Sequence, residues 1–276
     1  MIAIKEFPKK TFLNKEEMFK ALRENKGTLS AQKKMITKQA DAVVFISEVK
    51  DTKGNTVKAD AVDVTDVNKL RLKVVINTTN LMDSHSDVHF KGIWKKSVKE
   101  KKDLYLLQEH RMKFDHIISD NVKASVQLMN WSDLGQKFQG QTEALVFDVE
   151  IDKRNEFMFH QYAKGYVKNH SVGMRYVKME LAINSESKWD IEEKEVWDKY
   201  IDQIANKEVA EEKGYFWAVT EAKIIEGSAV PIGSNTITPT LEVETKNIEP
   251  SNDTQKQEAD AQSLQRKQLL TNILNN

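Results

Sequence analysis

The sequence predicts a mixed fold, mainly β, with a few helices. Short apolar runs and stretches of alternating apolar and polar residues recur along the chain, as they do in buried and half-buried strands. Helical spacing is confined to fewer segments, and 276 residues are enough for one domain with appendages. Strands are expected over residues 42–46, 70–76, 104–107, 124–129, 144–151, 170–179, 215–219 and 222–225.

The first forty residues (1–40) are expected to form a helical arm. Asn14 is placed to cap a helix, and Glu17 occupies the capping-box position three residues later. Shorter helices are predicted over 92–100 and 155–164, because apolar residues recur there at helical spacing. The arm is therefore expected to be an accessory to a core made mainly of strands.

Residues 185–214 interrupt the strand pattern and predict a helical insertion. Tryptophan, tyrosine and isoleucine recur there at helical spacing among dense charges, and Gly214 can end the run. The folded unit around this insertion is expected to span residues 41–240. The polar segment 241–276 carries apolar residues only near its end, which indicates a linker followed by a short docking helix.

Composition excludes several classes of protein. Lys plus Arg and Asp plus Glu both number 42, so no basic field indicates a direct nucleic-acid partner. The chain has no cysteine, which excludes disulfides, thiolate metal sites and a cysteine nucleophile. No signal-peptide pattern and no run of about 20 apolar residues is present, so no membrane partner is expected and the protein is predicted to be cytosolic.

The densest set of metal-type ligands is Asp83, His85, Asp87 and His89. These donors could face a zinc or iron ion, which makes a metal-dependent hydrolase one alternative. Their spacing matches no well-specified zinc motif, and such residues after a strand more often form turns. The turn is the preferred interpretation, and no metal or other cofactor is expected.

Two other segments could supply a base and a nucleophile. His110 follows the strand at 104–107, whose end can hold an imidazole rigidly, although a histidine there is by default structural. Ser171 lies in a strand two residues before Gly173, where close backbone approach can turn N–H groups toward an oxyanion. Without further information, the residues themselves favour an ordinary serine in a strand. Spacing cannot pair Ser171 with His110, because triad members are neighbours in space rather than in sequence.

Four segments resemble segments of the prohead protease family of tailed phages and follow one another along the chain in the same order as in that family. The fold of this family is similar to that of the herpesvirus assemblin proteases. The segment Ser171-Val172-Gly173-Met174 is similar to the family's S-[IV]-G-[FM] nucleophile strand. The other three are 81–94, which resembles the family's early aspartate-containing segment, 106–110, which resembles the strand delivering its histidine, and 226–235, which resembles its closing strand. The resemblance implies an assemblin-like β-barrel with surrounding helices.

The resemblance also implies a serine endopeptidase, with Ser171 as nucleophile and His110 as its base. The closing strand supplies Glu226 as the implied third member. His170 is a competitor because the assemblin relatives use a second histidine, but strand alternation places it on the face opposite Ser171. Oxyanion donors are expected from the backbone near the nucleophile or from the Arg175 guanidinium.

The implied partners are the major capsid protein and the scaffolding protein. Cleavage of the enzyme by itself is expected as well, and the resemblance allows a homo-oligomer. The implied location is the host cytoplasm, inside the immature phage prohead. A second alternative is a catalytically silent capsid-assembly protein that keeps the protease fold.

Overall fold

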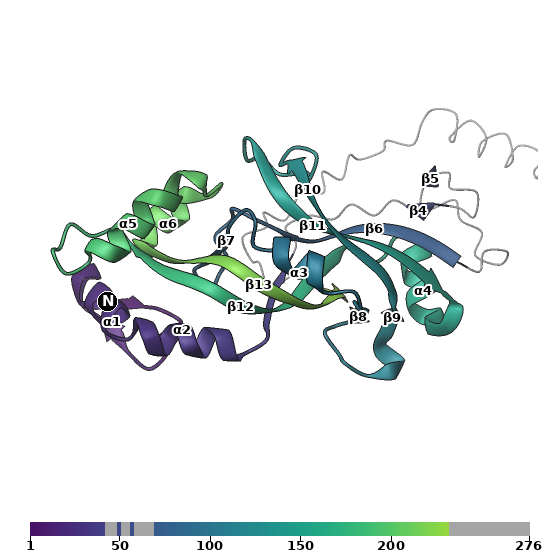
Figure 1. Cartoon of the computed structure of the whole chain (residues 1–276), viewed down its shortest axis with the longest axis horizontal. Helices are drawn as coiled ribbons and strands as arrows, with labels where there is room; N and C mark the ends of the chain where they lie inside the picture. The colour runs from purple at the N-terminus through teal and green to yellow at the C-terminus, as the bar shows by residue number, and fades with distance from the viewer. Residues whose placement is uncertain (42–48, 51–55, 58–68, 232–276) are drawn as a thin grey trace, which may run out of the picture. The chain divides into compact units, whose positions relative to one another are not determined.

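A computed structural model describes residues 1–41, 49–50, 56–57 and 69–231 (Figure 1). They form a mixed α/β fold with more strand than helix, as the sequence predicted. The strands belong to open sheets, and no closed barrel is present among the described residues. The predicted strand at 42–46, the end of the closing block beyond residue 231 and the tail at 241–276 lie outside the described residues.

The first sheet is antiparallel, and its strand order is β10, β11, β6, β4 and β5. In β6 and β11 a run of buried residues adjoins residues that alternate between buried and exposed, and these two patterns are what the sequence analysis recognised. The strands are β10 (Asn121–Asn130), β11 (Gln141–Asp152), β6 (Lys69–Thr78), β4 (Val49–Lys50) and β5 (Thr56–Val57).

The second sheet carries the candidate site. Its strand order is β3, β12, β13, β8 and β9, with β7 also paired to β13. The predicted strands at 215–219 and 222–225 are one long strand, because pairing with β12 continues across the polar residues between them. The strands are β3 (Lys38–Asp41), β12 (Asn169–Ile183), β13 (Tyr215–Val230), β8 (Leu106–Gln108), β9 (Ile117–Ser119) and β7 (Asp87–His89).

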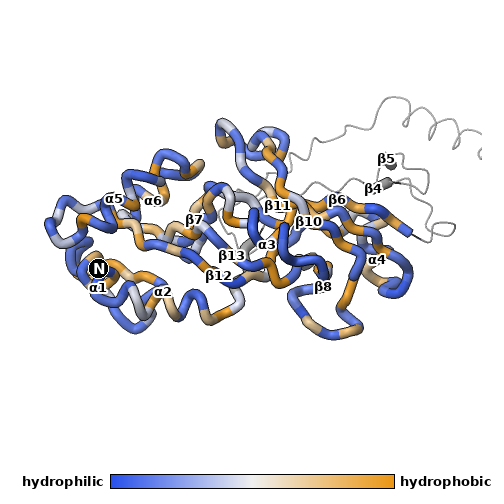
Figure 2. Tube along the Cα trace, viewed as in Figure 1, coloured by the Kyte–Doolittle hydropathy of each residue, from blue (hydrophilic) through white to orange (hydrophobic). Residues whose placement is uncertain are grey.

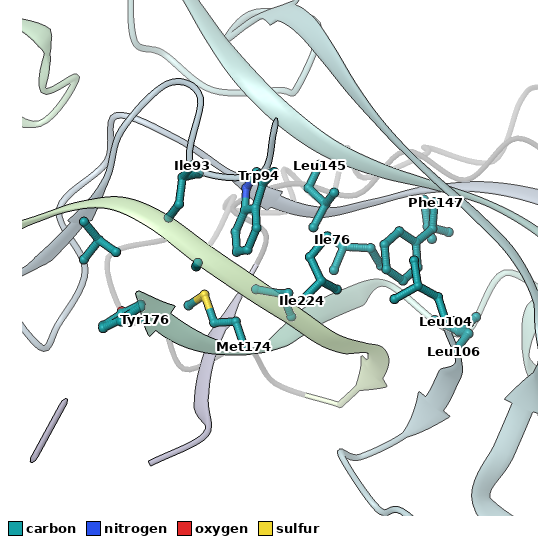
Figure 3. Packing of buried hydrophobic residues seen from close by; sticks show 14 of the residues in the cluster. Ile76, Ile93, Trp94, Leu104, Leu106, Leu145, Phe147, Met174, Tyr176 and Ile224 are labelled. Carbon is teal, nitrogen blue, oxygen red and sulfur yellow. The ribbon is translucent and has the colours of Figure 1, made fainter. Parts of the chain in front are cut away.

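Apolar side chains from both sheets form the core (Figure 3). Ile76 and Phe147 come from the first sheet, whereas Met174 and Ile224 come from the second. At Gly227 of β13 a Cβ atom would lie only 2.6 Å from the Phe147 ring, so the glycine allows the sheets to approach closely. The face of β13 that carries Gly227 is therefore the core face.

The arm begins with a small hairpin and continues in two helices. The hairpin joins β1 (Ile2–Ala3) to β2 (Thr11–Phe12). In α1 (Lys15–Glu24) the Asn14 side chain accepts from the Glu17 N–H at 2.9 Å, as the capping pattern predicted. The second helix, α2 (Lys26–Met35), was not predicted, because Gly27 and its polar neighbours lower helix propensity. It forms where it packs against β12.

The predicted helices elsewhere are present, with shorter bounds. They are α3 (Lys95–Glu100), α4 (Glu156–Ala163) with the 3-10 turn η3 (Lys153–Asn155) before it, and the insertion helices α5 (Ile191–Tyr200), η4 (Ile201–Gln203) and α6 (Lys207–Lys213). The insertion lies between β12 and β13, and Gly214 ends α6 at φ 80°, where a side chain would be strained. Figure 2 shows the charged helices of the arm and insertion largely hydrophilic. Among the described residues no helix is long and apolar enough to cross a membrane.

A buried ion network anchors the arm to the core. Lys33 of α2 contacts the carboxylate of Asp87 in β7 and lies 3.4 Å from Glu6, whose side chain is 2% exposed. Glu6 also accepts from the Tyr215 hydroxyl at 2.8 Å and from the Trp217 indole N–H at 3.0 Å. Burial lowers the pKa of Lys33, but the neighbouring carboxylates of Asp87 and Glu6 outweigh burial and raise it overall.

Lys33→Met is expected to lower the free energy of unfolding by about 3–5 kcal/mol, because it leaves buried carboxylates without their cation. Denaturant unfolding followed by circular dichroism measures the change. The matched control is Lys194→Met, which removes an exposed ion pair with Asp198 and is expected to change little. A loss at Lys33 no larger than that of the control would show that the network does not anchor the arm.

Candidate functional site

The candidate site lies at the end of the second sheet where β13 and β8 finish and β12 begins. The strands β8 and β13 are parallel, with Leu107 beside Ser228, so both strands finish at the same end of the sheet. Since β12 is antiparallel to β13, its first residues meet the last residues of β13. This topology brings three distant parts of the chain together.

The register of β12 and β13 places four site residues on one face. Ser171 lies opposite Ser228, and Gly173 lies opposite Glu226. Directly opposed residues share a face, and so do residues two apart on one strand. The intervening Gly227 faces the core, so these four residues lie on the other side of the sheet.

His110 and Glu226 form a close pair on this face. The distance from His110 Nδ1 to Glu226 Oε1 is 2.6 Å, and their side chains are only 10% and 5% exposed. A carboxylate can only accept, so Nδ1 donates to Glu226, and in the neutral imidazole the second nitrogen, Nε2, is then an acceptor. A histidine oriented in this way by a carboxylate is the base arrangement of serine hydrolases.

A strained turn positions the His110 imidazole beside Glu226. Glu109 and His110 have φ values of 54° and 57°, in the left-handed region that residues other than glycine rarely adopt. The turn closes with the Arg111 N–H donating to the Gln108 carbonyl at 3.0 Å. Such strain is typical of functional sites, where surrounding contacts maintain it.

Ser228 joins the pair and was assigned no role from the sequence. Its hydroxyl accepts from the His110 backbone N–H at 3.0 Å and donates to Glu226 Oε2 at 2.6 Å. The signal that could have identified it is its position two residues after Glu226, which places both side chains on the same face of a strand.

Gly173 provides the space that Glu226 occupies. A Cβ atom at Gly173 would overlap Glu226 Oε1 and lie 2.9 Å from its Cδ atom. The carboxylate thus packs directly on the glycine backbone, which no other residue type would allow without displacing it. The sequence predicts that this glycine brings backbone N–H groups near an oxyanion. The structure gives a second reason for a glycine here, because β13 places the Glu226 carboxylate against its backbone.

Ser171 lies on the same face as the pair. Its side chain is fully buried, and among the described residues its Oγ has no hydrogen-bond partner. It makes no hydrogen bond to His110 in this structure. An unsatisfied buried hydroxyl costs about 1–3 kcal/mol, which is unusual for a serine with a purely structural role.

His170 and Arg175, the other residues proposed from the sequence, lie apart from this set. His170 is on the core face, where its Nε2 lies 2.8 Å from the Tyr162 hydroxyl. Burial lowers the pKa of His170 to about 3, so it is neutral at physiological pH. Arg175 has an exposed side chain and lies opposite Lys223, beyond a register shift that follows Gly173.

The segment 83–89 forms a turn and a short strand. The Asp83 carboxylate accepts from the N–H groups of His85 at 2.7 Å and Asp87 at 2.9 Å, which is an Asx-type turn. His89 Nε2 lies 3.1 Å from the Tyr176 hydroxyl. Burial, with the nearby Asp87 charge, raises the pKa of Asp83 to about 7. Within the described ranges no group of three or more His, Cys, Asp or Glu side chains is placed to hold a metal ion.

In comparisons with protein families, curated proteins and solved structures, nothing matches this chain. Function is therefore inferred below from the geometry of the site.

Gly173→Ala is expected to break the His110–Glu226 hydrogen bond, because the new methyl group would overlap the carboxylate. The measurement is the imidazole Nδ1–H resonance of His110 by NMR, which should be lost or shifted while circular dichroism shows a folded protein. Gly27→Ala is the control, since no atom lies within 4 Å of a Cβ there. An unchanged resonance in Gly173→Ala would contradict the packing argument.

His170→Gln is expected to make the free energy of unfolding fall less steeply as the pH is lowered. Below pH 6.5 the unfolded chain protonates His170 while the folded chain keeps it neutral down to about pH 3, so stability present above pH 6.5 is lost as the pH falls. Between pH 7.5 and 5 the wild type should lose about 2 kcal/mol more unfolding free energy than the variant. Denaturant unfolding at several pH values tests this, and parallel curves would contradict it.

Proposed function

We propose that this protein is a serine endopeptidase with Ser171 as nucleophile, His110 as general base and Glu226 as the residue that orients the base. The observation that carries the proposal is the 2.6 Å hydrogen bond between His110 and Glu226 on the same sheet face as Ser171. A serine, a histidine and a carboxylate from three separate segments converge there, and triads are recognised by such roles rather than by sequence position.

In the proposed reaction Ser171 Oγ attacks the carbonyl carbon of a peptide bond. His110 Nε2 accepts the hydroxyl proton, and Glu226 stabilises the imidazolium through Nδ1–H. The proton then passes to the leaving amine as the C–N bond breaks, which leaves an acyl-enzyme. Water, activated by the same histidine, hydrolyses the ester and restores the serine. Backbone N–H groups near the nucleophile are the proposed oxyanion donors.

Burial of Ser171 sets a condition on this chemistry. The side chain has no exposed surface, so a peptide bond can reach Oγ only after the atoms that cover it move aside. Triad hydrogen bonds are often loose before substrate binds, which is consistent with the missing contact between Ser171 and His110. The proposal thus includes a conformational step before acylation.

The proposed biological role is maturation of a phage prohead, with the major capsid protein and the scaffolding protein as substrates. The support is the order of four sequence segments similar to the prohead protease family, two of which supply His110 and Ser171. Self-cleavage, association into a homo-oligomer and a location inside the immature prohead belong to the same proposal. The assemblin-like barrel is also part of this proposal. The described residues themselves form open sheets.

The alternative supported by one observation is a catalytically silent capsid-assembly protein, because Ser171 is buried and makes no hydrogen bond with His110. A metal-dependent hydrolase has less support. Asp87 is held by Lys33 and by the Tyr176 hydroxyl at 3.0 Å, and the Asp83 carboxylate is occupied by backbone N–H groups.

Ser171→Ala and His110→Ala are expected to abolish cleavage when the protein is co-expressed with its capsid and scaffolding proteins. Intact-mass spectrometry should find the wild type trimming these proteins or itself, with losses of about 10³-fold or more in both variants. Labelling by a fluorophosphonate, mapped to the Ser171 peptide, gives a second measurement that needs no natural substrate.

Ser132→Ala and His160→Ala are the matched controls, because both side chains are exposed and neither is hydrogen-bonded to Ser171, His110 or Glu226. They should cleave and label like the wild type. Equal trimming by all variants would overturn the protease proposal, and cleavage abolished only by chelators would favour the metal-dependent alternative.

A further inference from the structure

We infer that Ser228 is a positioning residue that holds Glu226 and the His110 turn in one arrangement, an inference that rests on the proposed function. Its hydroxyl contacts both members of the pair, Glu226 through Oε2 and His110 through the backbone N–H. No other described side chain is hydrogen-bonded to both residues.

The hydroxyl of Ser228 uses its only hydrogen and one lone pair in these two contacts. A hydroxyl has one hydrogen to donate, and here it goes to Glu226 at 2.6 Å, while a lone pair accepts the His110 N–H at 3.0 Å. The side chain is completely buried, so water does not compete for either bond. Hydrogen bonds to a buried carboxylate are among the stronger ones in proteins.

The consequence for Glu226 is that both carboxylate oxygens are held. Oε1 accepts from His110 and lies on the Gly173 backbone, while Oε2 accepts from Ser228. Rotation of the carboxylate would break one of these bonds. Ser228 therefore keeps Oε1 directed at His110 Nδ1.

The consequence for His110 is that its left-handed backbone is stabilised at the N–H group. With φ at 57°, the residue would otherwise favour an ordinary extended or helical conformation, which would move the imidazole. The hydrogen bond to Ser228 offsets part of this strain. The same hydroxyl thus fixes the backbone of the base and the carboxylate that orients it.

The facing serines Ser171 and Ser228 consequently have different roles. Ser228 has its donor and acceptor satisfied, whereas Ser171 Oγ has no partner among the described residues. A committed hydroxyl is a poor nucleophile because the carboxylate already holds its hydrogen away from the histidine Nε2. The free hydroxyl of Ser171 is the one available to attack.

The test compares Ser228→Ala with Ser228→Cys and with the wild type. The first readout is the tautomer of His110, measured by ¹⁵N NMR of the imidazole, which needs no activity. Wild type should show Nδ1–H, and Ser228→Ala should shift His110 toward Nε2–H, with Ser228→Cys intermediate because a thiol is a weak donor. A merely structural serine would change stability without changing the tautomer.

The second readout is fluorophosphonate labelling and peptide cleavage. Ser228→Ala should reduce the labelling rate and kcat about 10- to 100-fold with little change in KM, because it removes a hydrogen bond to a charged group. An unchanged tautomer in a folded Ser228→Ala protein would overturn the positioning role. Labelling at Ser228 instead of Ser171 would overturn it as well.

The two proposals can fail separately. If Ser171→Ala leaves cleavage intact, the protease proposal fails, but the tautomer comparison still decides whether Ser228 positions His110. If Ser171 is labelled and Ser228→Ala changes neither tautomer nor rate, the protease proposal stands and the role of Ser228 is rejected.

Discussion

The antiparallel pairing of β12 with β13 holds together both the core and the candidate site. It joins the two longest strands, and one face of this pair packs on the first sheet through Gly227 and Phe147. The opposite face carries Ser171, Glu226 and Ser228 in register. A slip of one residue would turn those side chains toward the core and the apolar ones outward, so core packing itself enforces the alignment of the site.

The site combines satisfied and unsatisfied polar groups in a buried environment. Glu226 is held from three directions, by His110, by Ser228 and by the bare backbone of Gly173. Ser171, by contrast, is buried, and its hydroxyl has no hydrogen-bond partner in the part of the chain that the structure describes. A rigidly held set of side chains beside an unsatisfied buried hydroxyl is a pattern often found at functional sites.

Several elements were predictable from local sequence, because their signals are local. The capping box at Asn14, the alternation in β6 and the helical insertion between β12 and β13 all appear as expected. The helix α2 was missed, since its stability comes from packing against β12 rather than from its own residues. The arm's anchoring by Lys33 was not predicted either, because its partners Glu6 and Asp87 lie far away in sequence.

The sequence is enough to predict a fold with more strand than helix, to exclude thiol chemistry and to single out Ser171 and His110 as candidate site residues. It could also separate His170 from Ser171, because alternation along a strand is a local property. Long-range packing alone brings Glu226 to His110, leaves space for the carboxylate at Gly173 and links the pair through Ser228. These contacts depend on strand register and on a left-handed turn, which arise from long-range packing rather than from any local pattern.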